Sequence, residues 1–127
     1  MAIAEILSKL RASTTIKTLL NATVADDRIY AVPTNYTGNC ITWQAYTVSE
    51  NKIVNNTRLT ITIISDTMTQ SFSIEQAVGA ALLTLGDAPL TSKIHLVELS
   101  GGGTLYDYER QKHHRTLYYT VISRSDL

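Results

Sequence analysis

The stretch TRLTITIIS, from Thr57 to Ser65, carries the clearest strand pattern in the sequence and decides the fold class. Apolar and polar residues alternate along it, which places the apolar side chains on one face of a half-buried strand. We expect a core face of Leu59, Ile61 and Ile63 and an outward face of Arg58, Thr60 and Thr62.

A long helix is predicted soon after this strand. Ser73 and Gln76 have the spacing of a capping box, in which side chains satisfy the free backbone N–H groups at the start of a helix. Gly86 and Pro89 then mark its end, because glycine favours the position after a helix and proline cannot continue one. Between these signals the apolar residues repeat with helical spacing, at Ile74, Ala77, Val78, Ala81, Leu82 and Leu85.

The rest of the chain adds a helical segment before these elements and strands on both sides of them. An amphipathic helix is expected from Ala2 to Ala12, and Thr14 or Thr15 could cap a short helical turn that reaches Leu20. The other strands are expected at RIYAV (28–32), CITWQAY (40–46), IHLVEL (94–99) and RTLYYTVIS (115–123). This order predicts an α+β fold, an antiparallel sheet with helices packed on one face, in a single domain spanning residues 1–127.

The composition is that of a folded protein with no charge preference. The 127 residues are 44% hydrophobic and 17% charged, and Lys+Arg and Asp+Glu both number 11. This balance argues against a dedicated nucleic-acid binder, which normally carries an excess of basic charge. No apolar run approaches the roughly 18 residues of a membrane span. The single cysteine, Cys40, excludes an intrachain disulfide, and we expect it to pack in a strand as a small hydrophobic residue.

The stretch GGGTLYDYERQKHHR, from Gly101 to Arg115, contains the residues most suggestive of chemistry. It is not a phosphate-binding loop, because no Lys-Ser or Lys-Thr pair follows its last glycine. A metal site is disfavoured as well, since His113 and His114 are adjacent and would point to opposite faces of a strand. We expect both histidines to be solvated residues at a loop boundary.

Acid–base catalysis is the remaining chemical possibility in this stretch. Asp107 and Glu109 are two residues apart and would share a face of an extended chain. Arg110 and Lys112 lie beside them, which favours an ion-paired surface over a catalytic pair. Neither a G-x-S-x-G nor an H-E-x-x-H motif occurs in the sequence. No catalytic, metal-binding or cofactor-binding residues are therefore predicted.

We instead interpret the stretch as a long connection between two strands. Its three glycines would allow unusual backbone angles and free movement. Tyrosine and arginine are enriched at the energetic centres of protein interfaces. The connection is therefore predicted to be a mobile protein-contact loop, with the tyrosines as anchors, formed by Tyr106, Asp107, Tyr108, Glu109 and Arg110.

A second candidate contact lies between two predicted strands, in the hairpin from Thr47 to Asn56. Ile53 and Val54 in this hairpin have no periodic reason to be buried in their own subunit. We predict that the hairpin extends from the sheet and buries one of them against another protein chain. The candidate residues are Ser49, Glu50, Lys52, Ile53 and Val54.

A series of short motifs runs in a fixed order along nearly the whole chain. After the amphipathic N-terminal segment come RIYAVP, ITWQAYTVSEN, TRLTITIISD, SIEQAVGAALLTLGD and YDYERQKHHRTLYYTVI. In this order the chain resembles the tail-completion, or tail-terminator, family of long-tailed bacteriophages. The resemblance rests on the order of the motifs and not on any invariant residue.

The resemblance implies a structural role. Proteins of this family form a ring, typically a hexamer, that caps the head-proximal end of the tail tube and stops its polymerisation. The implied partners are other copies of the chain, the tail tube protein and the head-completion or stopper protein, with genomic DNA passing through the lumen without sequence-specific binding. The implied location is the virion tail, after assembly in the host cytoplasm, with no cofactor and no membrane. The hairpin would then pack against the neighbouring subunit, and the loop against that subunit or the tube.

Two other classes of protein stay open. One is another ring-forming connector of the head–tail neck, a stopper or an adaptor, for which affinity for the portal in place of the tube would be diagnostic. The other is a small α+β enzyme whose site is assembled from scattered residues. A ligand or metal carried by the purified protein would favour the enzyme.

Overall fold

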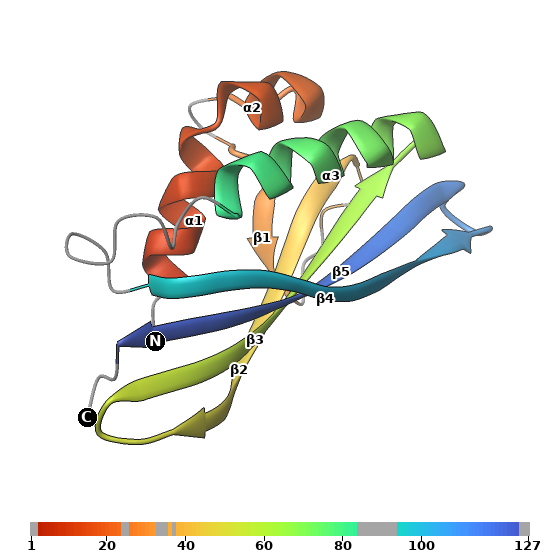
Figure 1. Cartoon of the computed structure of the whole chain (residues 1–127). Helices are drawn as coiled ribbons and strands as arrows, with labels where there is room; N and C mark the ends of the chain where they lie inside the picture. Colours follow the sequence, from red (N-terminus) through yellow and green to blue (C-terminus); the bar gives the residue numbers. More distant parts are fainter. Residues whose placement is uncertain (1–2, 24–25, 33–35, 37, 84–93, 125–127) are drawn as a thin grey trace.

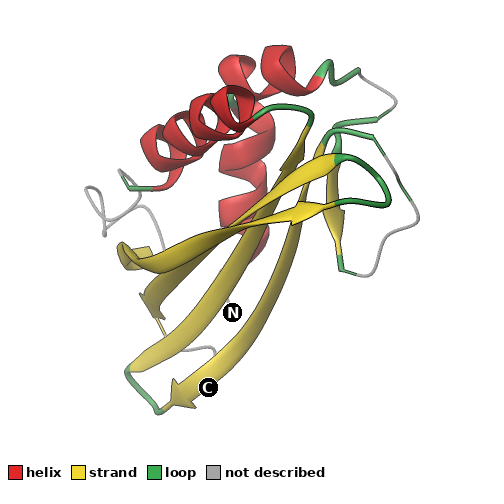
Figure 2. Cartoon of the chain, turned by 90° about the vertical axis from the view of Figure 1, so that its right-hand side faces the viewer, coloured by secondary structure: helices red, strands yellow, loops and turns green. Residues whose placement is uncertain are grey.

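Three helices lie together on one face of a five-stranded sheet in the computed structural model, which describes residues 3–23, 26–32, 36, 38–83 and 94–124 (Figure 1; Figure 2). This arrangement confirms the predicted α+β class. The elements, in chain order, are α1 (Ile3–Ala12), α2 (Thr14–Leu20), β1 (Ile29–Ala31), β2 (Cys40–Glu50), β3 (Val54–Ser65), α3 (Met68–Leu82), β4 (Ile94–Asp107) and β5 (Lys112–Arg124).

The sheet has the strand order β1-β2-β3-β5-β4 and is antiparallel except at one edge. There β1 runs parallel to β2, with Ile29 opposite Ile41 and Ala31 opposite Trp43. The prediction of a wholly antiparallel sheet is therefore wrong for β1. Alternation and composition identify a strand but carry no information on its direction, so a three-residue edge strand gave no signal for this pairing.

The core lies between the helices and one face of the sheet. Leu59, Ile61 and Ile63 of β3 are completely buried on the helix side, as their alternation predicted. Because strand pairing keeps the faces in phase, the same side of β5 also contributes buried residues. The other fully or nearly fully buried residues include Ile6, Leu10, Ile16, Ile41, Ile74, Val78, Leu82, Leu117, Tyr119 and Val121.

Both later helices begin earlier than the sequence signals suggested. α3 begins at Met68, where the Thr67 hydroxyl accepts a hydrogen bond from the Gln70 N–H at 3.1 Å. The predicted Ser73 cap is wrong because Thr67 and Gln70 have the same capping-box spacing and come first after β3, so the helix is already formed at Ser73. In the same way Ser13, and not Thr14 or Thr15, caps α2. Gly86 and Pro89 lie outside the described residues.

The predicted long loop after Gly101 is also wrong, because β4 continues through all three glycines to Asp107. The connection to β5 is only the turn at residues 108–111. None of the three glycines has a positive φ. Gly102 instead permits close strand approach, since a Cβ there would lie 2.7 Å from the backbone oxygen of Thr116. A Cβ at Gly103 would have no neighbouring atom within 4 Å.

Candidate functional site

The tip of the β2–β3 hairpin, residues 51–53, is a tight turn organised by one side chain. The Asn51 Oδ1 atom accepts hydrogen bonds from the N–H groups of Ile53 and Val54 at 2.7 and 2.9 Å. The Asn51 N–H in turn donates to the Val54 carbonyl at 3.0 Å. An asparagine that bonds the backbone two and three residues ahead favours such a turn. This end of the hairpin extends away from the three helices (Figure 1).

The residues predicted for a subunit contact lie around this tip and are mostly exposed. Ser49 and Glu50 end β2, and Lys52 is in the turn. The side chain of Ile53 is 77% exposed, so its own chain does not bury it, as expected. Val54 is half-buried and opens β3, where it pairs with β5. Of the two predicted apolar contacts, Ile53 is therefore the better candidate, and the contact itself stays a prediction.

The tip of the β4–β5 hairpin, residues 107–112, is built around a carboxylate. The Asp107 Oδ1 atom accepts hydrogen bonds from the N–H groups of Glu109 and Arg110 at 3.1 and 3.3 Å. The Arg110 Nε atom lies 4.0 Å from the Asp107 Oδ2 atom. Gln111 takes a left-handed backbone conformation, with φ of 56°, which reverses the chain into β5. Asp107 therefore shapes the turn, as an aspartate at the first position of a turn commonly does.

Aromatic rings pack beside this turn. The Tyr106 ring lies 4.9 Å from the Tyr108 ring and 4.8 Å from the His113 ring, with edge-to-face geometry in both pairs. Tyr108 is nevertheless 84% exposed. The predicted contact residues thus divide between the end of a strand and a formed turn, and the expectation of a mobile loop is wrong. The contact with a partner remains a prediction, with Tyr108 as its most accessible ring.

Leu105 and His114 form a cross-strand pair next to this tip. The expectation that His114 is a solvated residue at a loop boundary is wrong, because β5 begins at Lys112 and His114 lies within the paired strand. Leu105 is 71% exposed. His114 is largely covered, and burial lowers its pKa even though Asp107, 3.7 Å away, opposes the shift; Arg110 lowers it further. Within the described part of the chain, the His114 Nε2 atom has no hydrogen-bond partner. Strand alternation could not have found the exposed Leu105, because the register of β4 on β5 shifts between Ile94 and Leu96 and again between Leu99 and Gly101.

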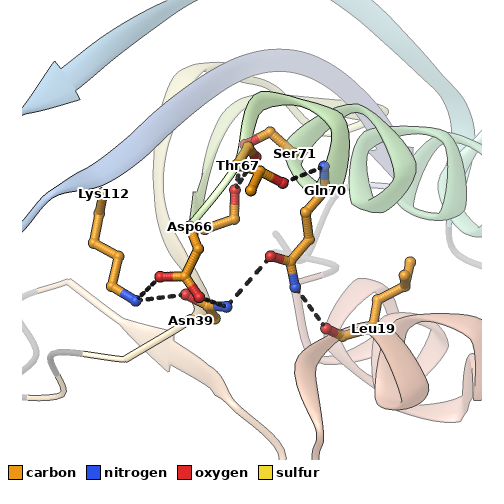
Figure 3. Close-up of polar contacts among 8 residues, drawn as sticks. Leu19, Asn39, Asp66, Thr67, Gln70, Ser71 and Lys112 are labelled. Atoms are coloured by element: carbon orange, nitrogen blue, oxygen red, sulfur yellow. Dashed lines mark hydrogen bonds and ion pairs between the residues drawn. The ribbon is translucent and has the colours of Figure 1, made fainter.

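A polar cluster joins the tip of the β4–β5 hairpin to the helices (Figure 3). Lys112 Nζ donates a hydrogen bond to Asn39 Oδ1 at 2.9 Å and forms an ion pair with Asp66. Asn39 Nδ2 donates to Asp66 Oδ2 at 3.1 Å, and Gln70 Nε2 donates to the Leu19 carbonyl at 3.1 Å. Hydrogen bonds from Lys112 and then Asn39 lower the pKa of Asp66. Each of these groups bonds another part of the chain, so the cluster fixes the fold.

The described residues hold little reactive chemistry. Cys40 is completely buried at the start of β2, which confirms its predicted packing, and burial raises its thiol pKa to about 11. The described residues contain no cluster of three or more His, Cys, Asp and Glu side chains fit to bind a metal ion.

None of the described helices is long and apolar enough to span a membrane. A hollow of about 260 Å³ between the helices is lined by Lys9 and otherwise by small alanine, serine and threonine residues.

A chain of a gene transfer agent virion has this fold. No protein-family model and no curated protein matches the sequence. A chain in the solved structure of the virion of a native gene transfer agent particle does match in structure, with a TM-score of 0.69 at 12% sequence identity. The match covers 94% of this chain and 92% of that chain. At this identity the likeness shows a common fold, which extends over nearly the full length of both chains.

Proposed function

We propose that the chain is a structural protein of a phage-like virion and forms a ring that caps the tail tube. The observation that carries the proposal is the fold shared, over nearly the whole of both chains, with a component of a gene transfer agent virion. The order of motifs supports the same role independently, because it resembles that of tail terminators. The ring ends tail polymerisation and presents the surface to which the head is joined.

The surface chemistry of the described residues supports an assembly role over catalysis. Large apolar side chains are exposed on the sheet and at both hairpins, among them Val48, Ile53, Leu96, Leu105 and Tyr108. Polar groups that resemble a reactive site, such as Lys112 and Asp66, are instead bonded to each other and hold the fold. Exposed apolar side chains gathered on one surface are typical of protein contacts. These exposed side chains support a role in binding other protein chains.

The two hairpin ends take different roles in this proposal. The β2–β3 tip, with Ser49, Glu50, Lys52 and Ile53, packs against the neighbouring copy in the ring. The β4–β5 tip, with Tyr108 most accessible, contacts the tail tube protein or the adjacent copy. A head-completion or stopper protein binds the opposite face of the ring, and genomic DNA passes through the lumen. The neutral net charge suits a lumen that makes no sequence-specific contact with DNA.

Capping of purified tail tubes tests the proposal. Tube protein is allowed to polymerise with and without the chain, and tube length and end decoration are recorded by electron microscopy. We expect a density the width of the tube at one end and an arrest of growth. The matched control is the chain with Tyr108→Ser, which keeps the fold and loses capping. Unchanged tube growth together with binding to the portal would identify an adaptor or stopper instead.

A further inference from the structure

The sheet has two unpaired edges among the described residues, one on each side. On one side β1 covers β2 only from Ile41 to Trp43, and Val32 adds one further hydrogen bond to Trp43. The outer edge of β2 from Gln44 to Glu50 therefore has no strand partner in the described part of the chain. On the other side β4 is the last strand of the sheet. Unpaired edges present rows of free N–H and C=O groups that can pair with another chain.

The free segments of β2 and β4 lie at the same level along the strand direction, on opposite edges of the sheet. Tyr46 of β2 is opposite Arg58 of β3, Arg58 is opposite Thr120 of β5, and Thr120 is opposite Glu98 of β4. The free segment of β2 is thus level with the first half of β4. The directions also agree, because β2 and β4 run in opposite directions within one sheet. Copies related by rotation about an axis along the strands would meet as an antiparallel pair.

The side chains along this row are complementary in charge. Glu98 is exposed at the β4 edge and forms no ion pair with a described residue. Arg58, one strand inward from the other edge, is exposed and has no carboxylate partner among the residues that the structure describes. Its guanidinium donates to the Tyr46 hydroxyl at 3.4 Å and lies 5.7 Å from the Tyr118 ring centroid. A second copy placed edge to edge would set the Glu98 carboxylate against the Tyr46 hydroxyl and the Arg58 guanidinium.

Exposed apolar side chains follow the same two edges. Tyr46 and Val48 are about half exposed on β2, and Leu96 and Leu99 are about half exposed on β4. Natural edge strands are usually short or carry charges that prevent pairing. β4 is instead 14 residues long and carries leucines and glycines along its length. The register of β4 on β5 shifts between Ile94 and Leu96 and between Leu99 and Gly101, so the regular stretch from Leu96 to Leu99, which contains Glu98, is the part of this edge suited to pairing.

We infer that the first half of β4 pairs antiparallel with the free half of β2 in a second copy of this chain, so that Glu98 faces Tyr46 and Arg58 of that copy. Each copy then donates one edge and accepts the other, a head-to-tail contact that closes into a ring when the rotation closes. The inference rests on the proposed ring and specifies the contact that forms it.

A disulfide trap tests the pairing. In one chain Tyr46 and Glu98 lie three strand spacings apart, roughly 14 Å at about 4.8 Å per spacing. A disulfide requires Cα atoms within about 7 Å, so the variant with Tyr46→Cys and Glu98→Cys can crosslink only between copies. The buried thiol of Cys40 does not compete. The control variant carries Glu98→Cys with Ser8→Cys, a position that is exposed on α1 and is not part of the sheet.

The expected result is a ladder of crosslinked species on a non-reducing gel from the edge pair and none from the control. A charge exchange provides a second, independent measurement. Glu98→Arg and Arg58→Glu should each weaken assembly about fivefold per contact, the scale of an exposed ion pair, and the double variant should restore it. A ring that forms without edge crosslinking and without charge rescue overturns the pairing alone. A chain that stays monomeric with tube protein present overturns both the pairing and the proposed ring.

Discussion

The two hairpins differ in how firmly their tips are tied to the rest of the molecule. The β2–β3 tip is organised by Asn51 alone, and Ile53 projects from it largely exposed. The β4–β5 tip is held by the Tyr106 ring packing and by Lys112, which is bonded to Asp66 and Asn39 at the helix side of the sheet. A change at the first tip should therefore affect assembly alone. A change at the second tip that removes Tyr106 or Lys112 should affect folding as well as assembly.

The largest expected effect is on the ring, from the β2–β3 tip. Ile53→Ser removes a side chain whose burial between copies would stabilise each contact by roughly 1.5–3 kcal/mol. Since every interface of the ring repeats this loss, we expect assembly to fail at concentrations where the unaltered chain assembles. Light scattering measures the assembly, and circular dichroism and melting of the monomer should stay unchanged.

Leu83→Ser is the matched control for that change. Leu83 is an apolar side chain about half exposed at the end of α3, far along the chain from the hairpin. It should leave the ring intact. If Ile53→Ser unfolds the monomer, or if the control abolishes the ring equally, the distinction between the two tips is lost.

The next effect is on stability and concerns the paired strands of the β4–β5 hairpin, away from its tip. Gly102→Ala places a Cβ against the Thr116 backbone oxygen and the Leu117 side chain, which crowds a packed sheet. Overpacking of this kind lowers the free energy of unfolding by about 1–3 kcal/mol. Gly103→Ala meets no atom within 4 Å and should change it by far less. Urea unfolding of the two variants measures the difference, and equal stabilities would show that β4 does not approach β5 closely at Gly102.

A smaller effect separates two tyrosines on the same tip. Tyr106→Ser removes two edge-to-face contacts and should lower the free energy of unfolding by about 0.5–1.5 kcal/mol. Tyr108→Ser removes a mostly exposed ring and only one of these two contacts, so it should lower stability less than Tyr106→Ser while abolishing tube capping. Chemical unfolding combined with the capping assay compares the variants. Full capping by the Tyr108 variant would mean that this tip has no partner.

The smallest effect is a pH dependence near the β4–β5 tip. Burial lowers the pKa of His114 below its usual value of 6.5, so the unfolded chain takes up a proton more readily than the folded one. The stability that neutral His114 provides is complete above pH 6.5 and is lost as the pH falls toward the lowered pKa. The carboxyl groups of Asp26 and Asp66 also have lowered pKa values, and their contribution is lost only below about 3.8.

His114→Leu isolates the contribution of His114 to this pH dependence. It removes the titrating group and puts an apolar side chain of similar size in its place. Unfolding followed between pH 7 and pH 5 should show a shallower loss of stability in the variant than in the unaltered chain. Equal slopes would assign the pH dependence to other groups. The β2–β3 tip has no histidine. A pH dependence of stability that arises from that tip would contradict its assignment to His114.

Much of the fold could be predicted from the sequence because burial imposes a period. The alternation in β3 located the core face, where Leu59, Ile61 and Ile63 are all completely buried. The glycine run was misinterpreted because glycine is depleted in strands, and its close approach to Thr116 depends on a pairing with no local signal. The start of α3 was missed since two identical capping patterns lie six residues apart.

The candidate site was predictable where it depended on exposure and unpredictable where it depended on distant contacts. The lack of any periodic reason to bury Ile53 correctly indicated an exposed tip. Nothing local connects Lys112 to Asn39, which is 73 residues earlier in the chain, because that contact exists only after β2, β3 and β5 have paired. The free edges of β2 and β4 depend in the same way on the strand order.

The mass of the purified chain, alone and mixed with tail tube protein, tests the central claim most directly. Native mass spectrometry resolves a closed ring from a distribution of open oligomers. The account predicts one discrete species, six times the 14.0 kDa chain, whose proportion rises when tube ends are present and falls with Ile53→Ser. A strict monomer of 14.0 kDa under both conditions would contradict it.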